Sequence, residues 1–219
     1  RRRAGMSASR RPRIHVLAGV NGAGKSSIGG AAVRQHGGEY FNPDEAARAL
    51  REKDPTLAQA DANGAAWRQG VKLLKRAIEE GLDCTFETTL GGNTITSLLM
   101  QAAEQGIEVH VWYVGLSSPE LHIERVQARV SRGGHDIPEH DIHRRYEHSR
   151  LNLIALLPRL TTLHVYDNSV DADPAAGRTP RLMPVLHMKQ GKIIGPPDLA
   201  ATPNWAKPIV AAALKLSQP

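Results

Sequence analysis

The sequence has one cysteine, few aromatic residues and no long apolar run. Cys84 has no partner for a disulfide within the chain, which is typical of a protein in a reducing compartment. No apolar stretch approaches the roughly 20 residues that a membrane-spanning helix needs. The N-terminus has arginines but lacks the apolar segment of a secretory signal. We therefore expect a cytoplasmic protein without a membrane segment.

The net charge is concentrated at one end of the chain. The 219 residues carry a formal charge of +6, but five arginines lie among residues 1–12: Arg1, Arg2, Arg3, Arg10 and Arg11. Without them, 23 basic residues face 22 acidic ones. This nearly neutral body argues against a broad nucleic-acid-binding surface. Residues 1–12 are expected to be a disordered basic arm or a cloning remnant, since Met6 can serve as a natural start.

The most informative segment is a phosphate-binding loop (P-loop). Residues 19–26 read Gly-Val-Asn-Gly-Ala-Gly-Lys-Ser and fill every fixed position of G-x-x-x-x-G-K-[ST]. The glycines allow turn conformations in which backbone N–H groups converge on phosphate oxygens. A strand expected at 14–18 and a helix expected at 27–36 supply the required strand–loop–helix order. The alternative is a glycine-rich turn that binds nothing.

On the first interpretation, ATP or GTP is bound by seven consecutive residues: Asn21, Gly22, Ala23, Gly24, Lys25, Ser26 and Ser27. Lys25 is expected to reach the β- and γ-phosphates, and the Ser26 hydroxyl to ligate Mg²⁺. The loop does not say whether the phosphate is hydrolysed or transferred.

Strands and helices are expected to alternate along most of the chain. Further strands are predicted at 39–41, 82–86, 107–114 and 162–166, and helices at 45–52, 57–80, 94–105, 118–131 and 137–156. This alternation predicts an α/β fold in which helices cover both faces of a parallel sheet, giving three layers. Residues 171–219 are rich in proline and glycine. A hairpin at 184–194 and a helix at 205–216 are expected there, as an extension packed on the same domain.

Polar residues follow the expected strands at the edge where a parallel sheet binds ligands. Asp44 is the best candidate for a general base that accepts a proton from a substrate hydroxyl; the alternative is that it only caps the next helix. Glu87, with Thr88 and Thr89, can hold a substrate hydroxyl or a water on Mg²⁺, or can be ordinary strand-end polarity. Asn168 is expected near the nucleotide base.

An arginine-bearing helix is followed by a glycine pair. Arg125, Arg129 and Arg132 recur at helical spacing and precede Gly133-Gly134. Arginines that close over a transferring phosphoryl group stabilise its charge, so this segment predicts a hinged lid. A solvated charged helix face is the alternative. The nearby His135, His140, His143 and His148 lack a convincing zinc spacing, and we expect them to be solvated.

Together these residues resemble the zeta-toxin family of P-loop kinases, in particular its chromosomal subgroup. The resemblance spans about residues 13–170, the expected P-loop kinase domain. It rests on residues 17–27, 42–45, 86–90, 125–126, 129–130, 133–135, 137–139, 144–146, 152–153 and 167–169.

The resemblance implies a Mg²⁺- and ATP- or GTP-dependent kinase that phosphorylates a sugar hydroxyl. In the best-known members the acceptor is UDP-N-acetylglucosamine at its 3′-hydroxyl, and an antitoxin protein is the partner. It further implies Asp44 as base, Lys25 on the phosphates, and substrate contacts at Glu87 and Thr89. Arg125 would act near the γ-phosphate with Arg132, although Arg129 or His135 can take the second place.

The resemblance also has a gap. Toxin members carry a substrate-binding glutamate on the helix before the strand of Glu87, and Val71 stands at about that position here. The acceptor therefore stays open. Two other functions stay open as well: a 5′-hydroxyl nucleic-acid or nucleoside kinase, and a non-catalytic regulatory nucleotide-binding module.

Overall fold

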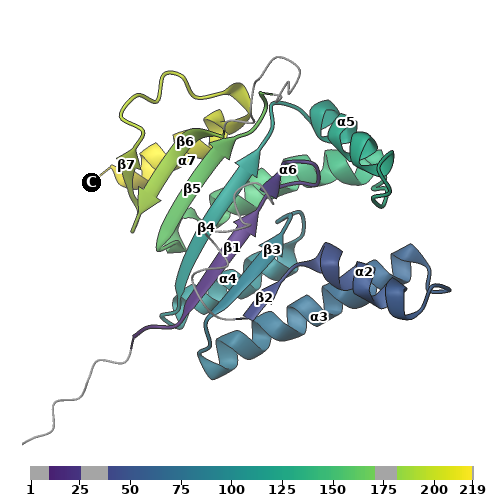
Figure 1. Cartoon of the computed structure of the whole chain (residues 1–219). Coiled ribbons are helices and arrows are strands. Elements are labelled where there is room, and N and C mark those ends of the chain that lie inside the picture. The colour runs from purple at the N-terminus through teal and green to yellow at the C-terminus, as the bar shows by residue number, and fades with distance from the viewer. Residues whose placement is uncertain (1–9, 26–38, 171–181, 219) are drawn as a thin grey trace, which may run out of the picture.

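The computed structural model describes residues 10–25, 39–170 and 182–218, which form a seven-stranded sheet covered by helices (Figure 1). The strand order is β2-β3-β1-β4-β5-β6-β7. The strands are β1 (Arg13–Ala18), β2 (Glu39–Phe41), β3 (Cys84–Thr88), β4 (Glu108–Gly115), β5 (Thr162–Asp167), β6 (Met183–Lys189) and β7 (Lys192–Gly195). The first five strands pair in parallel, and β6 and β7 join antiparallel.

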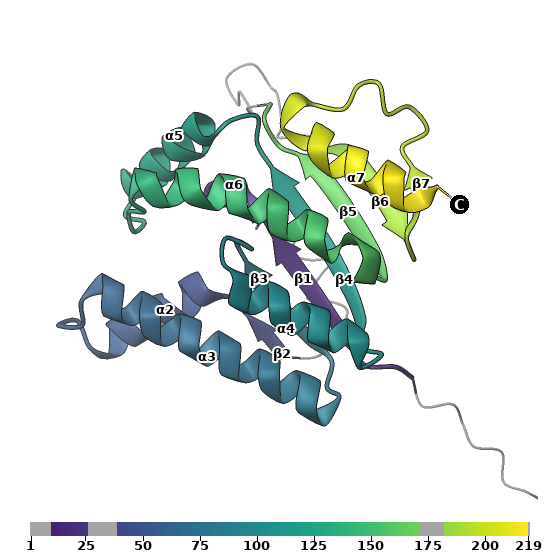
Figure 2. The same cartoon turned by 180° about the vertical axis from the view of Figure 1, so that it is seen from behind.

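Four of the described helices lie over one face of this sheet. Figure 2 shows α3 (Gln59–Glu80), α4 (Asn93–Glu104), α6 (Glu139–Leu156) and α7 (Lys207–Ser217) in front of the strands. Two further helices, α2 (Pro43–Lys53) and α5 (Pro119–Val130), stand beyond the carboxyl ends of the strands. Single turns η2 (Leu157–Arg159) and η4 (Asn204–Ala206) precede β5 and α7.

The main core lies between the sheet and these four helices. Alternate residues of β1, Ile14, Val16 and Ala18, are fully buried against it, as period-two alternation requires. The helices contribute apolar stripes that include Leu74, Leu99, Leu153 and Ile209. Burial of one such side chain stabilises the fold by about 1.5–3 kcal/mol, so this layer fixes the position of the strand ends.

The opposite face of the sheet carries a row of stacked rings. His15 stacks on His110 at 5.0 Å between ring centroids. Farther along, Trp112 stacks on His164 at 5.7 Å, and His164 on His187 at 3.8 Å. These rings alternate with core residues on β1, β4, β5 and β6, so they project from the other side of the same strands.

The α/β fold predicted from the sequence is confirmed, with two corrections, while a helical layer on the second face of the sheet stays a prediction, since the described helices cover one face. The sheet is mixed rather than wholly parallel, because the predicted C-terminal hairpin pairs with β5 and extends the main sheet. The strand predicted at 82–86 runs instead from Cys84 to Thr88, since its pairing with β1 continues to Ala18. The helix predicted at 27–36 lies outside the described residues. Across the described ranges, no helix has both the length and the apolar composition needed to cross a membrane.

We expect the free energy of unfolding to fall as the pH drops below about 6.5. Burial, with smaller contributions from His187 and His110, lowers the pKa of His164 from 6.5 to about 4. The unfolded chain therefore takes up this proton first, and stability present above pH 6.5 is lost between pH 6.5 and 4. Allowing for partial exposure, the loss from His164 is about 1–3 kcal/mol at pH 4.

Urea unfolding at pH 7 and pH 4.5 measures this effect. His164→Gln should show a smaller pH-dependent loss than the wild type, because it removes one titrating ring from the stack. An identical loss in both proteins would contradict the assignment.

Candidate active site

The P-loop follows β1, the middle one of the five parallel strands, and packs closely against the carboxyl edge of the sheet. Gly19 has a φ of +143°, and a Cβ at this position would lie 2.3 Å from the carbonyl oxygen of Val114. Gly22 has a φ of +82°, and its Cβ would lie 2.7 Å from the carbonyl oxygen of His122. Gly24, with a φ of +84°, is also left-handed. Only glycine fits these positions, and such turns suit phosphate binding.

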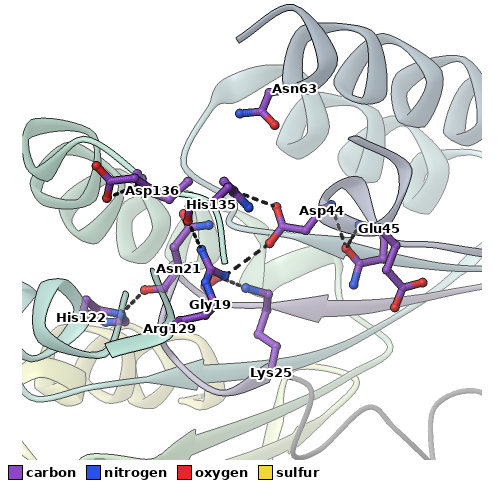
Figure 3. A network of polar contacts seen from close by, with 12 residues as sticks. Gly19, Asn21, Lys25, Asp44, Glu45, Asn63, His122, Arg129, His135 and Asp136 are labelled. Carbon is purple, nitrogen blue, oxygen red and sulfur yellow. Dashed lines mark hydrogen bonds and ion pairs between the residues drawn. The ribbon is translucent and has the colours of Figure 1, made fainter. Parts of the chain in front are cut away.

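Three side chains from other elements hold the loop. The Asn168 amide donates to the carbonyl oxygen of Ala23 at 2.9 Å. Arg145 of α6 donates to the Asn21 side-chain oxygen at 2.7 Å. His122 of α5 lies with Nδ1 2.8 Å from the Asn21 carbonyl oxygen (Figure 3). Burial lowers the pKa of His122 to about 4, so the ring is neutral near pH 7 and Nδ1 carries the donated hydrogen.

Lys25 is held by its own loop. Its ammonium group donates to the Gly19 carbonyl oxygen at 2.9 Å. Burial lowers the pKa of Lys25, while the negative charges of Glu87 and Asp44 act in the opposite direction. Phosphate oxygens would replace this carbonyl contact and compensate the buried charge. The loop residues described here therefore fit a nucleotide phosphate.

Asp44 is available for chemistry because another residue caps its helix. Asn42 Oδ1 accepts from the backbone N–H groups of Asp44 at 2.8 Å and Glu45 at 3.2 Å. The helix begins at Pro43 rather than at 45, since proline suits the first turn. The Asp44 side chain is 47% exposed. The alternative that Asp44 caps α2 is therefore wrong.

The carboxylate of Asp44 faces two basic side chains from the lid segment. Arg129 Nη1 lies 3.8 Å from Oδ2, and His135 Nε2 lies 3.8 Å from Oδ1 (Figure 3). Burial lowers the pKa of His135 and Arg129 lowers it further, against the opposing effect of Asp44. Neither contact is short enough for a hydrogen bond, and the His135 contact is an ion pair only when the ring is protonated. The carboxylate can therefore turn toward a substrate.

Glu87 and its neighbours form the floor of the site. Glu87 and Thr88 are buried at the end of β3. The Tyr40 hydroxyl donates to the Glu87 carboxylate. The side-chain oxygens of Thr88 and Thr89 accept from backbone N–H groups two residues later, at 3.0 and 3.3 Å. Both threonines therefore shape the turn after β3, and their substrate contacts stay a prediction.

A cavity of about 300 Å³ opens in front of these residues. It brings together the P-loop, the end of β3, the start of α2, one face of α3 and the start of α6. Its lining includes Asn21, Asp44, Trp67, Glu87, Thr89 and Arg145. Asp44 and Glu87, which were predicted to follow two separate strands, thus share one cavity with the P-loop residue Asn21.

The three predicted lid arginines have different surroundings in the structure. Arg125 lies on α5 with its Cβ beside Gly22. Arg132 is exposed in the turn after α5, and its catalytic role stays a prediction. Arg129 instead extends to Asp44, and its Nη2 donates to the His135 carbonyl oxygen at 3.1 Å.

Three contributors were missed from the sequence alone. Arg145 and His122 hold the loop, and Tyr40 holds Glu87. One sequence signal pointed to Arg145: Asp141 precedes it by four residues, a spacing at which the two side chains pair on a helix, as they do here. His140, His143 and His148 are exposed on α6, as predicted. The prediction was wrong for His135, which lies beside Asp44 with its side chain 19% exposed.

The predicted Mg²⁺ ligand and two of the predicted nucleotide-binding residues lie outside the described part of the chain. Ser26 and Ser27 fall outside the described residues, so the Mg²⁺ ligand stays a prediction. Within residues 10–25, 39–170 and 182–218 no group of three or more His, Cys, Asp or Glu side chains is arranged to hold a metal. Asp44 and Glu87 are the carboxylates of the cavity and offer the oxygen ligands that Mg²⁺ prefers.

Asn168→Ala should weaken nucleotide binding by about threefold to tenfold, because it leaves the Ala23 carbonyl without its buried donor. Isothermal titration with ATP and GTP measures the loss, and exposed Asn93→Ala is a matched control. Since the contact is to the loop, both nucleotides should lose affinity equally. Unequal losses would show instead that Asn168 reads the base.

Comparison with known proteins agrees with this architecture. The profile of the AAA domain family matches residues 14–149. An uncharacterized protein of Haemophilus influenzae is 33% identical over 129 residues, which are 58% of this chain and 88% of that protein.

Two groups of solved structures share the fold at low sequence identity. The AvrRxo1-ORF1:-ORF2 complex with ATP aligns at a TM-score of 0.63 and 16% identity over 94% of this chain. This chain spans 65% of that chain's length. A chain of the PezAT chromosomal toxin-antitoxin system of Streptococcus pneumoniae aligns at a TM-score of 0.52 and 18% identity, covering 78% of this chain and 75% of its own.

These likenesses confirm a P-loop kinase-like α/β fold. The matched profile covers more than half of the chain and includes the P-loop, Asp44 and Glu87. The chain therefore belongs to the AAA domain family.

Proposed function

We propose that this chain is a kinase that transfers the γ-phosphoryl group of Mg·ATP to a hydroxyl of a small sugar or sugar nucleotide. The observation that carries the proposal is the position of Asp44. Its carboxylate lines the cavity, lies close enough to Lys25 to affect its pKa, and is not used as a helix cap. A base placed between the phosphate site and an acceptor cavity is what phosphoryl transfer to a hydroxyl requires.

In the proposed reaction, Asp44 accepts the proton of the acceptor hydroxyl while the hydroxyl oxygen forms a bond to the γ-phosphorus. The bond between this phosphorus and the β–γ bridging oxygen breaks, and ADP leaves with the electron pair. Lys25 moves from the Gly19 carbonyl to the phosphate oxygens and offsets their charge. When bound, Mg²⁺ supplies charge neutralisation on the β- and γ-phosphates.

Arg129 is the lid arginine that the geometry favours for the second position beside the γ-phosphate. It is near Asp44, whereas Arg132 is exposed in the turn beyond α5. When phosphate occupies the space in front of Asp44, the guanidinium can exchange its long ion pair for charge-assisted bonds to phosphoryl oxygens.

The acceptor is proposed to occupy the cavity between Glu87 and α6. Glu87 is buried, is held by Tyr40 and can accept a hydrogen bond from a second hydroxyl. Arg144 and Arg145 line the same cavity and can bind an anionic group of the acceptor. This combination supports a polyhydroxylated ligand, with UDP-N-acetylglucosamine as the first compound to test.

An antitoxin partner in the cytoplasm is also part of the proposal. The supporting observation is that the AvrRxo1-ORF1:-ORF2 and PezAT structures are, by name, a two-protein complex and a toxin-antitoxin system.

Asp44→Asn should reduce phosphoryl transfer by about 100-fold or more, since the amide cannot accept the proton. ATP affinity should change little, because Asp44 is on α2 and not in the loop. Transfer is measured with γ-labelled ATP and UDP-N-acetylglucosamine, nucleosides or 5′-hydroxyl oligonucleotides. Glu52→Gln, at the other end of α2, is the matched control.

Turnover of Asp44→Asn at the wild-type rate would contradict this assignment. Labelled oligonucleotide without labelled sugar would indicate a nucleic-acid kinase. Nucleotide binding without transfer to any acceptor would indicate a regulatory module.

The two candidate lid arginines can be separated by single substitutions. Arg129→Ala should lower kcat at least tenfold, because it removes positive charge beside Asp44. Arg132→Ala should leave kcat within about twofold, since its side chain is solvated. Steady-state kinetics at saturating ATP tests this, and the reverse order would assign the lid position to Arg132.

A further inference from the structure

Helix α3 is packed unusually close to the sheet where it borders the cavity. A Cβ at Gly70 would lie 2.6 Å from the Phe41 ring and 3.1 Å from the Phe86 ring. Phe41 and Phe86 stack on each other at 5.4 Å between ring centroids. Because Gly70 carries no side chain, the helix axis approaches β2 and β3, and the preceding turns of α3 reach the cavity.

Two side chains on those preceding turns line the cavity. Asn63 and Trp67 are four residues apart, and Trp67 and Gly70 three, so all three share one face of α3. Figure 3 shows the Asn63 side chain extending from α3 toward the space beside His135 and Asp44. Trp67 lines the same cavity and is 50% exposed.

Trp67 is a half-exposed tryptophan on the wall of a cavity. Other exposed apolar side chains, such as Leu151 and Leu82, lie outside this cavity. An indole face in a wet cavity offers a large apolar surface, and aromatic rings prefer stacked neighbours. Trp67 therefore has the properties of a contact surface for a flat ligand ring.

The cavity is also asymmetric in charge. The wall made by α3 carries Asn63 and Trp67 beside the rings of Phe41 and Phe86, and the carboxylate of Glu87 lies on the floor of the cavity. The facing wall on α6 carries Arg144 and Arg145. A ligand that matches both walls has an uncharged ring on the α3 side and an anionic group on the α6 side.

We propose that Trp67 is a specificity-determining residue of the acceptor site, which stacks its indole on a ring of the acceptor. The inference rests on the proposed function for the identity of the site as an acceptor site. The shared chemistry is a flat or chair-shaped ring with an apolar face, which a sugar or a nucleobase can supply. Asn63, one turn earlier, is placed to hydrogen-bond the edge of the same ring.

Trp67 fluorescence tests this contact without turnover. Each of N-acetylglucosamine, uridine diphosphate and UDP-N-acetylglucosamine is titrated into the full chain in the absence of ATP. The chain has three tryptophans, so the Trp67 signal is the difference between the wild type and Trp67→Phe. We expect a ring-containing probe to change this signal at saturable concentrations. A response to the sugar alone, or to uridine diphosphate alone, identifies which ring stacks.

Substitutions then measure the contribution of the ring. Trp67→Ala should weaken probe binding by about tenfold or more, as loss of an aromatic stacking partner does. Trp67→Phe, which keeps a ring, should weaken it by only about threefold. Both variants should bind ATP like the wild type. Leu151→Ala, an exposed apolar residue of α6 outside the cavity, is the matched control.

The proposal is overturned if Trp67→Ala binds the probes as tightly as the wild type. It is also overturned if no probe changes the Trp67 signal at millimolar concentration. A Trp67 response without phosphate transfer would contradict the kinase function and leave the binding role intact. Phosphate transfer with an unchanged acceptor KM in Trp67→Ala would contradict the binding role of Trp67 and leave the kinase function intact.

Discussion

The seating of the P-loop against the ends of β1 and β4 is the constraint on which the site depends. Gly19 passes so close to the Val114 carbonyl that no side chain fits, and the loop then turns through two more left-handed glycines. Backbone alone does not fix such a turn. Its carbonyl groups are held by Asn168 and His122, from separate elements, so the phosphate site is a product of the tertiary fold.

The C-terminal segment also supports the strand ends against which the P-loop packs. Trp205 packs its ring against Gly115, where a Cβ would lie 2.2 Å from the ring. Its indole Nε1 donates to the Asp167 carboxylate at 3.3 Å. Asp167 directly precedes Asn168, whose amide holds the Ala23 carbonyl oxygen. Residues outside the matched family profile therefore support the strand end that carries Asn168.

The sequence was sufficient for features that depend on local backbone chemistry. The P-loop, the order of strands and helices, and the candidates Asp44 and Glu87 follow from motif and periodicity. Contacts between distant segments were not predictable in this way. Nothing in the spacing of α6 shows that Arg145 reaches Asn21, and no local pattern shows that β6 pairs with β5. Likewise, helical spacing put Arg129 and Arg132 on one face, although only Arg129 lies at Asp44.

The central claim is that the P-loop, Asp44 and the cavity form one site for phosphoryl transfer. The most direct measurement is a crystal structure with a non-hydrolysable ATP analogue and the acceptor that binds best. The account predicts the γ-phosphate in front of Asp44, Lys25 on the phosphates, and an acceptor hydroxyl within hydrogen-bond distance of the Asp44 carboxylate. A γ-phosphate directed away from Asp44, or an acceptor bound outside the cavity, would contradict it.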